Sequence, residues 1–182
     1  MMTRVVLWGT LSSLVFGAPG TARADDAEEK AVRLVQHLGG KVTRDPKRPG
    51  EPVVAVSLWG IQKADGQLKG LGALNDLASL DLSCSDVTAA GLKELTALKG
   101  LVALDLGSAP QVADEGLKEL AALKGLTSLS LRHVRRVTDA GLKELVTLEG
   151  LKELDLVGTK VTDAGVADLQ KALPNCKIKT KR

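Results

Sequence analysis

A six-residue apolar pattern recurs along this chain at nearly constant spacing, and no other feature constrains the fold as strongly. The pattern is L-x-x-L-x-L, and its clearest copies begin at Leu77, Leu101, Leu126 and Leu151. Successive copies lie 24 or 25 residues apart, and weaker copies begin at Val53 and Leu173. Self-similarity with this period predicts a stack of equivalent units, because one short unit cannot bury its own apolar face.

A second block, close to V-T-D-A-G-L-K-E-L, recurs between these segments and begins at Val87, Val112, Val137 and Val161. Thr or Asp ahead of leucines at helical spacing predicts the start of a short helix. The equivalent stretch of the first unit, residues 61–68, departs from the block and defines its helix start least clearly. We expect the helices to end at left-handed glycines, namely Gly100, Gly125 and Gly150.

Each unit therefore consists of a strand, a turn and a helix. Short apolar strands joined by helical crossovers form a parallel sheet. We expect an α/β fold: a short right-handed solenoid of five to six parallel strands, with the sheet on the concave face and the helices on the convex face.

The two blocks resemble leucine-rich repeats of the helix-containing type, as in ribonuclease inhibitor and the cysteine-containing repeats of F-box adaptors. The V-T-D-A-G-L-K-E-L block is most similar to short exported bacterial proteins of planctomycete type. The resemblance covers about residues 27–178 and implies the fold, but it implies little about activity. Only residues 26–38 precede the repeats as a helical segment, so a substrate-recognition role like that of F-box adaptors is the most distant alternative.

Residues 1–24 have the composition of a cleaved signal peptide. Arg4 precedes an apolar stretch at residues 5–16, and Ala22 and Ala24 are small residues at the positions that a signal peptidase reads. A membrane anchor is the alternative, but the stretch is shorter than the roughly 20 residues that span a bilayer. We expect cleavage near Ala24 and export to the periplasm or the extracellular space, without membrane insertion of the mature chain.

The ends of the stack need covering, because an open solenoid exposes apolar faces there. Residues 25–52 are expected to form an N-terminal cap helix, closed by Gly39 and Gly40, and a Pro-rich loop leading into the first strand. The repeats then occupy residues 53–173. Residues 174–182 are expected to form a C-terminal cap strand and a basic tail, whose charge discourages edge pairing.

Charge and composition exclude several classes of partner. Removal of residues 1–24 takes away Arg4 and Arg23, so the formal net charge falls from +3 to +1, and Trp59 is the only aromatic residue left. Nucleic-acid binding uses basic patches and stacking rings, and neither is expected here.

Cys84 and Cys176 are four strand steps, about 19 Å, apart, which is too far for a disulfide. Cys176 is expected in the core of the last strand, whereas Cys84 is either free or paired between chains.

The candidate binding site is the concave face. The residues before the final leucines place Asp81 beside Asp105, followed by Ser130, Asp155 and then Lys177, while Trp59 and Arg132 follow final leucines. Two interpretations of the carboxylates are open: an acidic stripe for a basic partner, or solvated residues partly paired with Arg132. Trp59 is either a binding anchor or packs against the cap. The basic run of residues 132–136 either contacts an acidic ligand or forms a solvated loop.

Nothing in the chain predicts catalysis. No Ser, His and acid are placed to form a triad, no phosphate loop occurs and no Cys/His metal spacing exists. We therefore expect no enzyme, no cofactor and no metal. The predicted function is binding of a protein partner by a monomer through Asp81, Asp105, Ser130, Arg132, Asp155 and Trp59. The alternative from another class is a structural or envelope-packing role without a specific partner.

Overall fold

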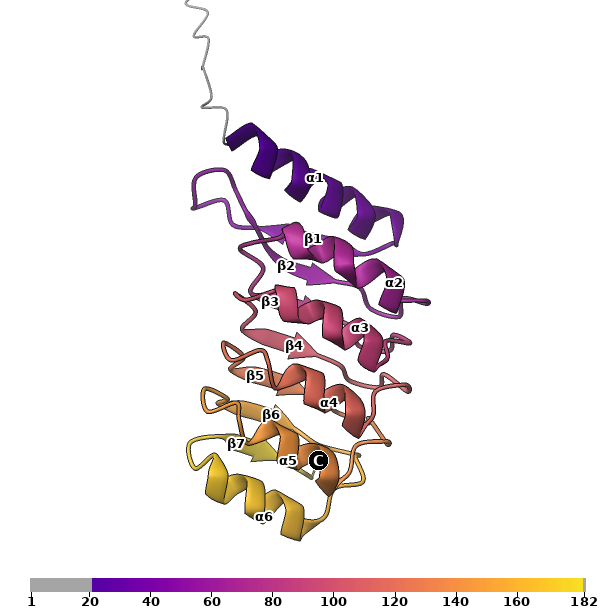
Figure 1. The fold of residues 1–182 in the computed structure, drawn as a ribbon, viewed down its shortest axis with the longest axis vertical. Helices are drawn as coiled ribbons and strands as arrows, with labels where there is room; N and C mark the ends of the chain where they lie inside the picture. Colours follow the sequence, from indigo (N-terminus) through magenta and orange to yellow (C-terminus); the bar gives the residue numbers. More distant parts are fainter. Residues whose placement is uncertain (1–20, 182) are drawn as a thin grey trace, which may run out of the picture.

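A computed structural model describes residues 21–181 and confirms the α/β repeat architecture (Figure 1). One sheet contains seven strands in chain order, parallel from β2 to β7, with β1 antiparallel to β2. The strands are β1 (Lys41–Arg44), β2 (Val53–Ser57), β3 (Ser79–Asp81), β4 (Ala103–Asp105), β5 (Ser128–Ser130), β6 (Glu153–Asp155) and β7 (Lys177–Lys179). Strand β1 lies outside the parallel repeats that the sequence predicted.

The helices lie in a row over one face of this sheet, with α1 at one end of the stack and α6 at the other (Figure 1). They are α1 (Thr21–His37), α2 (Asp65–Leu68), α3 (Ala89–Glu94), α4 (Asp114–Leu120), α5 (Asp139–Leu145) and α6 (Asp163–Ala172), with 3-10 turns η1 (Lys69–Ala73) and η2 (Leu95–Ala97). None of the helices within residues 21–181 is long and apolar enough to cross a membrane.

The leucines of the repeated pattern form the core between sheet and helices. Leu80, Leu104, Leu129 and Leu154 are each at most 2% exposed, and each pairs in register with its neighbour along the sheet. Burial of one leucine side chain contributes about 1.5–3 kcal/mol, so a column of them holds successive repeats together. The predicted helix starts are also confirmed where threonine is present, since three threonine side chains accept a backbone N–H bond at a helix start: Thr88, Thr138 and Thr162.

The predicted left-handed glycines are wrong. Gly100, Gly125 and Gly150 do not have positive φ angles. The left-handed position instead lies two residues after each final leucine, where the chain turns away from the strand. The residues there, which we call the left-handed column, are Gly60, Cys84, Ser108, His133 and Gly158, with φ between 57° and 77°. The first four donate their N–H to a carbonyl of the next repeat, at 2.7–2.8 Å, so the turn conformation is fixed by the stack and not by residue type.

The last repeat differs from its predicted register. Leu154 pairs with Ile178, and Asp155 pairs with Lys179. The prediction that Lys177 follows Asp155 in the same column is therefore wrong. Cys176 is buried but precedes β7. Its N–H donates to the Leu173 carbonyl, as the N–H of Leu151 donates to the Leu148 carbonyl in the preceding repeat, so Cys176 corresponds to Leu151. One residue separates Cys176 from Ile178, whereas two separate the corresponding leucines, and this shifts the strand.

Helix α1 packs against the first repeat, at the end of the stack where the sequence predicted an N-terminal cap. Ala31, Val32 and Val35 are buried, and Gly39 ends the helix with φ +77°, as expected. The helix begins at Thr21, so it includes the last four residues of the predicted signal peptide; residues 1–20 of that prediction lie outside the described residues.

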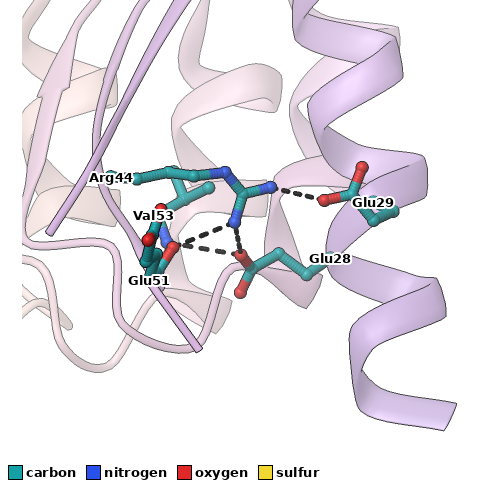
Figure 2. Close-up of polar contacts among 5 residues, drawn as sticks. All are labelled: Glu28, Glu29, Arg44, Glu51 and Val53. Carbon is teal, nitrogen blue, oxygen red and sulfur yellow. Dashed lines mark hydrogen bonds and ion pairs between the residues drawn. The ribbon is translucent and has the colours of Figure 1, made fainter. Parts of the chain in front are cut away.

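A polar cluster joins the cap helix to the first strands (Figure 2). The Arg44 guanidinium lies between Glu28 and Glu29 of α1 and also donates to the Glu51 carbonyl. Glu28 in turn accepts the backbone N–H of Val53 at 3.3 Å. Because Glu28 bonds both β1 and β2, the cluster fixes the angle at which the cap meets the sheet.

Candidate functional site

The face of the sheet that the helices leave uncovered corresponds to the predicted concave face, and we call it the open sheet face. Its central column consists of Ser57, Asp81, Asp105, Ser130, Asp155 and Lys179, which are register partners from strand to strand. The predicted proximity of Asp81 to Asp105 is therefore confirmed. All members are half-buried except Lys179, which is exposed.

The three aspartates of the column also hold the turns that follow their strands. Each accepts, through Oδ1, the backbone N–H two residues further on: Ser83 to Asp81 at 2.9 Å, Gly107 to Asp105 at 2.8 Å and Val157 to Asp155 at 2.9 Å. This structural role was not predicted. The signal in the sequence was the recurrence of Asp two residues before the turn, since Asp commonly makes this local bond.

The second carboxylate oxygens differ in what they contact. Oδ2 of Asp81 accepts the Ser57 hydroxyl at 2.8 Å, and Oδ2 of Asp155 lies 3.7 Å from Arg132. Oδ2 of Asp105 has no hydrogen-bond or ion-pair partner among the described residues. Asp105 is therefore the carboxylate of the column with the most unused capacity to bind.

Hydrogen bonding also controls the charge state of Asp81. Partial burial acts to raise its pKa, but bonds from the Ser83 hydroxyl, the Ser83 N–H and the Ser57 hydroxyl outweigh burial and leave the pKa below its ordinary value. Asp81 is thus ionised at neutral pH even though the surrounding side chains partly cover it.

Trp59 is 68% exposed, so the cap helix does not cover it. It belongs to the residues that directly follow the final leucines, together with Ser83, Gly107, Arg132 and Val157. Gly107 has no side chain to shield the neighbouring Asp105. The open sheet face thus combines one exposed aromatic residue with a half-buried carboxylate two strands away.

At its C-terminal end the open sheet face contains a hollow of about 290 Å³ between β5 and β7. It is lined by Ser128, Leu129, Ser130, Glu153, Leu154, Asp155, Lys177 and Lys179. Of these, only Ser130 and Asp155 were singled out as binding residues from the sequence. Lys179 was missed because the shifted last strand places it, rather than Lys177, opposite Asp155.

The basic run of residues 132–136 divides between two places. Arg132 pairs with Asp155 at the open sheet face, and Val134 is buried in the core. Arg135 and Arg136 are exposed and line a different hollow, together with His133.

The cysteines are separate, as predicted. They do not pair with each other: Cys84 is exposed and Cys176 is buried. Burial, together with the nearby Glu153 charge, raises the pKa of the Cys176 thiol, so it stays protonated and packs as an apolar residue. Within residues 21–181, no three His, Cys, Asp or Glu side chains converge as a metal site.

Comparison with known proteins agrees with this geometry. The leucine-rich repeat family model matches residues 73–95 and 151–169. Internalin C2 from Listeria monocytogenes is a similar solved structure, with 19% identity and a TM-score of 0.58, over 84% of this chain and 62% of internalin C2. The chain therefore contains leucine-rich repeats and has the fold of leucine-rich repeat proteins.

Two other solved structures also match this chain. TLR13, solved in complex with ssRNA13, has 21% identity and a TM-score of 0.54 over 69% of this chain and 18% of TLR13. A leucine-rich repeat protein of Leptospira interrogans has 27% identity and a TM-score of 0.48 over 61% of this chain and 27% of its own. No curated protein sequence matches this chain. The chain thus spans less than two thirds of each of these three relatives.

Proposed function

We propose that this protein is a non-catalytic interaction module that binds a protein partner through the open sheet face. The observation that carries the proposal is the ordered column of aspartate and serine side chains on that face, in which Asp105 Oδ2 has no partner among the described residues. Leucine-rich repeats and other solenoids commonly present extended surfaces of this kind to partners.

The residues proposed to bind are the six named from the sequence: Asp81, Asp105, Ser130, Arg132, Asp155 and Trp59. Asp105 would receive a basic side chain of the partner, because its Oδ2 has no hydrogen-bond or ion-pair partner among the described residues. Trp59 would supply an apolar anchor two strand spacings along the sheet and two residues beyond the column. The protein acts here as a monomer, since the lysines of β7 discourage edge pairing between copies.

The proposal is tested by affinity capture from envelope and secreted extracts, with a variant that removes charge but keeps the fold. Asp→Asn at positions 81, 105 and 155 neutralises the column, while the asparagine oxygen still accepts the turn N–H bond. Substitution by lysine would instead break the three turns. The matched control is Glu→Gln at the exposed positions 94, 115 and 149, which removes the same charge elsewhere.

We expect the native chain and the control variant to retain the same partner protein. The triple Asn variant and Trp59→Ala should fail to retain it. Equal retention by all four would exclude the open sheet face. If the native chain retains no specific protein, the structural or packing role is the better explanation.

We further propose that residues 1–24 direct export and are removed, so that the protein acts in the periplasm or outside a bacterial cell. Arg4, the apolar stretch and the Ala22–Ala24 segment support this. Mass spectrometry of the protein from its producing cells should give an N-terminus near Asp25. Recovery of an intact N-terminal segment in the cytoplasm would contradict it.

A further inference from the structure

A second hollow lies between the turn that follows β4 and the turn that follows β5. We call it the basic hollow; it has a volume of about 500 Å³ and is lined by Ser108, Pro110, His133, Arg135 and Arg136. Its lining contains two arginines, one histidine and no carboxylate. Neither arginine takes part in an ion pair within residues 21–181, whereas the nearby Arg132 pairs with Asp155 at the open sheet face.

His133 is held in a fixed position in this hollow. Its backbone has φ +60° and its N–H donates to the Val157 carbonyl at 2.7 Å. Its ring lies directly against Gly158, where a β-carbon would come within 2.3 Å of His133 Nδ1. The glycine therefore makes the space in which the imidazole rests.

The arginines come from the same turn, and one of them contacts the preceding repeat. Arg136 donates through Nη1 to Gln111 Oε1 at 3.3 Å, and its backbone forms a bridge with Ala113. Ser108, at the equivalent left-handed position of the preceding repeat, adds a hydroxyl to the same hollow. Two successive repeats thus direct hydrogen-bond donors into one space.

Two consecutive arginines that line one hollow without counter-charges favour an anion, because each guanidinium presents a planar set of N–H donors that matches an oxyanion. The site is small. Binding of a nucleic-acid strand relies on many separate phosphate contacts, and three basic residues in one turn do not form such a row.

We propose that the basic hollow binds an oxyanion, namely a phosphate or sulfate group, either as the free ion or as a monoester. The site lies apart from the open sheet face, and the proposal does not depend on the function proposed above.

The test is an NMR titration of the full chain with inorganic phosphate and, separately, with O-phosphoserine, against sodium chloride at equal ionic strength. We expect saturable shifts of the backbone amides of residues 133–136 with phosphate and none with chloride. Arg135→Gln/Arg136→Gln should weaken phosphate binding about tenfold or more, since each charge-assisted hydrogen bond is strong. Gly158→Ala should weaken it as well, because the β-carbon displaces the His133 ring.

The matched control is Lys93→Gln/Lys118→Gln, which removes two exposed charges from α3 and α4. Retained binding in the control, with loss in the arginine variant, supports the site. Tighter binding of O-phosphoserine than of inorganic phosphate identifies a phosphate monoester as the ligand. Equal binding of the two identifies the free ion. Shifts that do not saturate, or that fall equally in both charge variants, overturn the proposal. Circular dichroism checks the fold of each variant, and both arginines are exposed, so loss of fold is not expected.

Discussion

Asp114 in one repeat accepts two hydrogen bonds from Thr138 in the next, at 2.8 Å from its backbone N–H and 2.7 Å from its hydroxyl. We call this contact the Asp–Thr link. It recurs between two other pairs of successive repeats: Asp65 with Thr88, and Asp139 with Thr162. Between α3 and α4 the link is missing, because Ala89 and Ala113 replace both partners together.

Restoring the missing link should stabilise the protein. We expect Ala89→Asp/Ala113→Thr to raise the free energy of unfolding by about 1–2 kcal/mol, since it adds a helix cap and two hydrogen bonds. Urea unfolding of the double variant and both single variants measures the coupling between them. A sum of the single effects that equals the double effect would show that no link had formed.

The same link explains why glycine recurs in the helices. At Gly141 a β-carbon would lie 2.4 Å from Asp114 Oδ1, whereas at Gly116 its nearest neighbour is the flexible end of Leu92, at 2.9 Å. We expect Gly141→Ala to lower the free energy of unfolding by about 1–3 kcal/mol, because it pushes Asp114 away from Thr138.

Gly116→Ala should be close to neutral or stabilising, since alanine has a helix propensity about 0.8–1 kcal/mol better than glycine. Thermal unfolding ranks the two variants. A further check is to combine Gly116→Ala with Ala89→Asp/Ala113→Thr. In that background the alanine at position 116 should crowd the new aspartate at position 89 and lower the free energy of unfolding. Equal effects of Gly116→Ala and Gly141→Ala would contradict this explanation.

Cys84 occupies the left-handed column without being glycine, with φ +58°. Because a side chain in this conformation costs about 1 kcal/mol, Cys84→Gly should stabilise the protein by roughly that amount. Cys84→Ala is the control, since it removes the thiol but retains a β-carbon. Chemical denaturation of both variants decides: if alanine stabilises as much as glycine, the thiol and not the backbone is responsible.

Acid should weaken the Asp–Thr link at Asp139. The hydroxyl and backbone N–H bonds from Thr162 hold the pKa of Asp139 below its ordinary value. A carboxylate with a lowered folded-state pKa contributes stability that is fully present above its unfolded pKa, about 3.9, and is lost as pH falls through the folded value. Asp139→Asn should therefore make the free energy of unfolding less dependent on pH below about pH 4.

Urea unfolding at a series of acidic pH values tests this. Asp163→Asn is the matched control, because Asp163 occupies the equivalent position in the last repeat and accepts no bond from a described residue. An unchanged pH dependence in Asp139→Asn would contradict the assignment. Asp86 should behave in the same direction, since backbone bonds from Ala64 and Lys63 also lower its pKa.

The fold was predictable because the period of the leucines determines which residues become neighbours. That period alone placed Asp81 beside Asp105 in the sheet. The last strand was misplaced because a single missing residue after Cys176 changes the register without changing the apolar pattern.

The contacts between repeats were harder to predict. The Asp–Thr link joins residues 23 or 24 positions apart, and its members also resemble ordinary helix caps. The joint absence of both partners at Ala89 and Ala113 was the available signal. The left-handed column was missed because cysteine, serine and histidine at Cys84, Ser108 and His133 give no local indication of that conformation.

The missing link between α3 and α4 has a mechanical consequence. In a solenoid each repeat is held only by its immediate neighbours, so tension applied to the two ends passes through every junction in turn. The junction of Ala89 with Ala113 has no polar tie on its helical side. A chain pulled from its ends should therefore separate there first, leaving the α1–α3 and α4–α6 segments as two short blocks before either unravels.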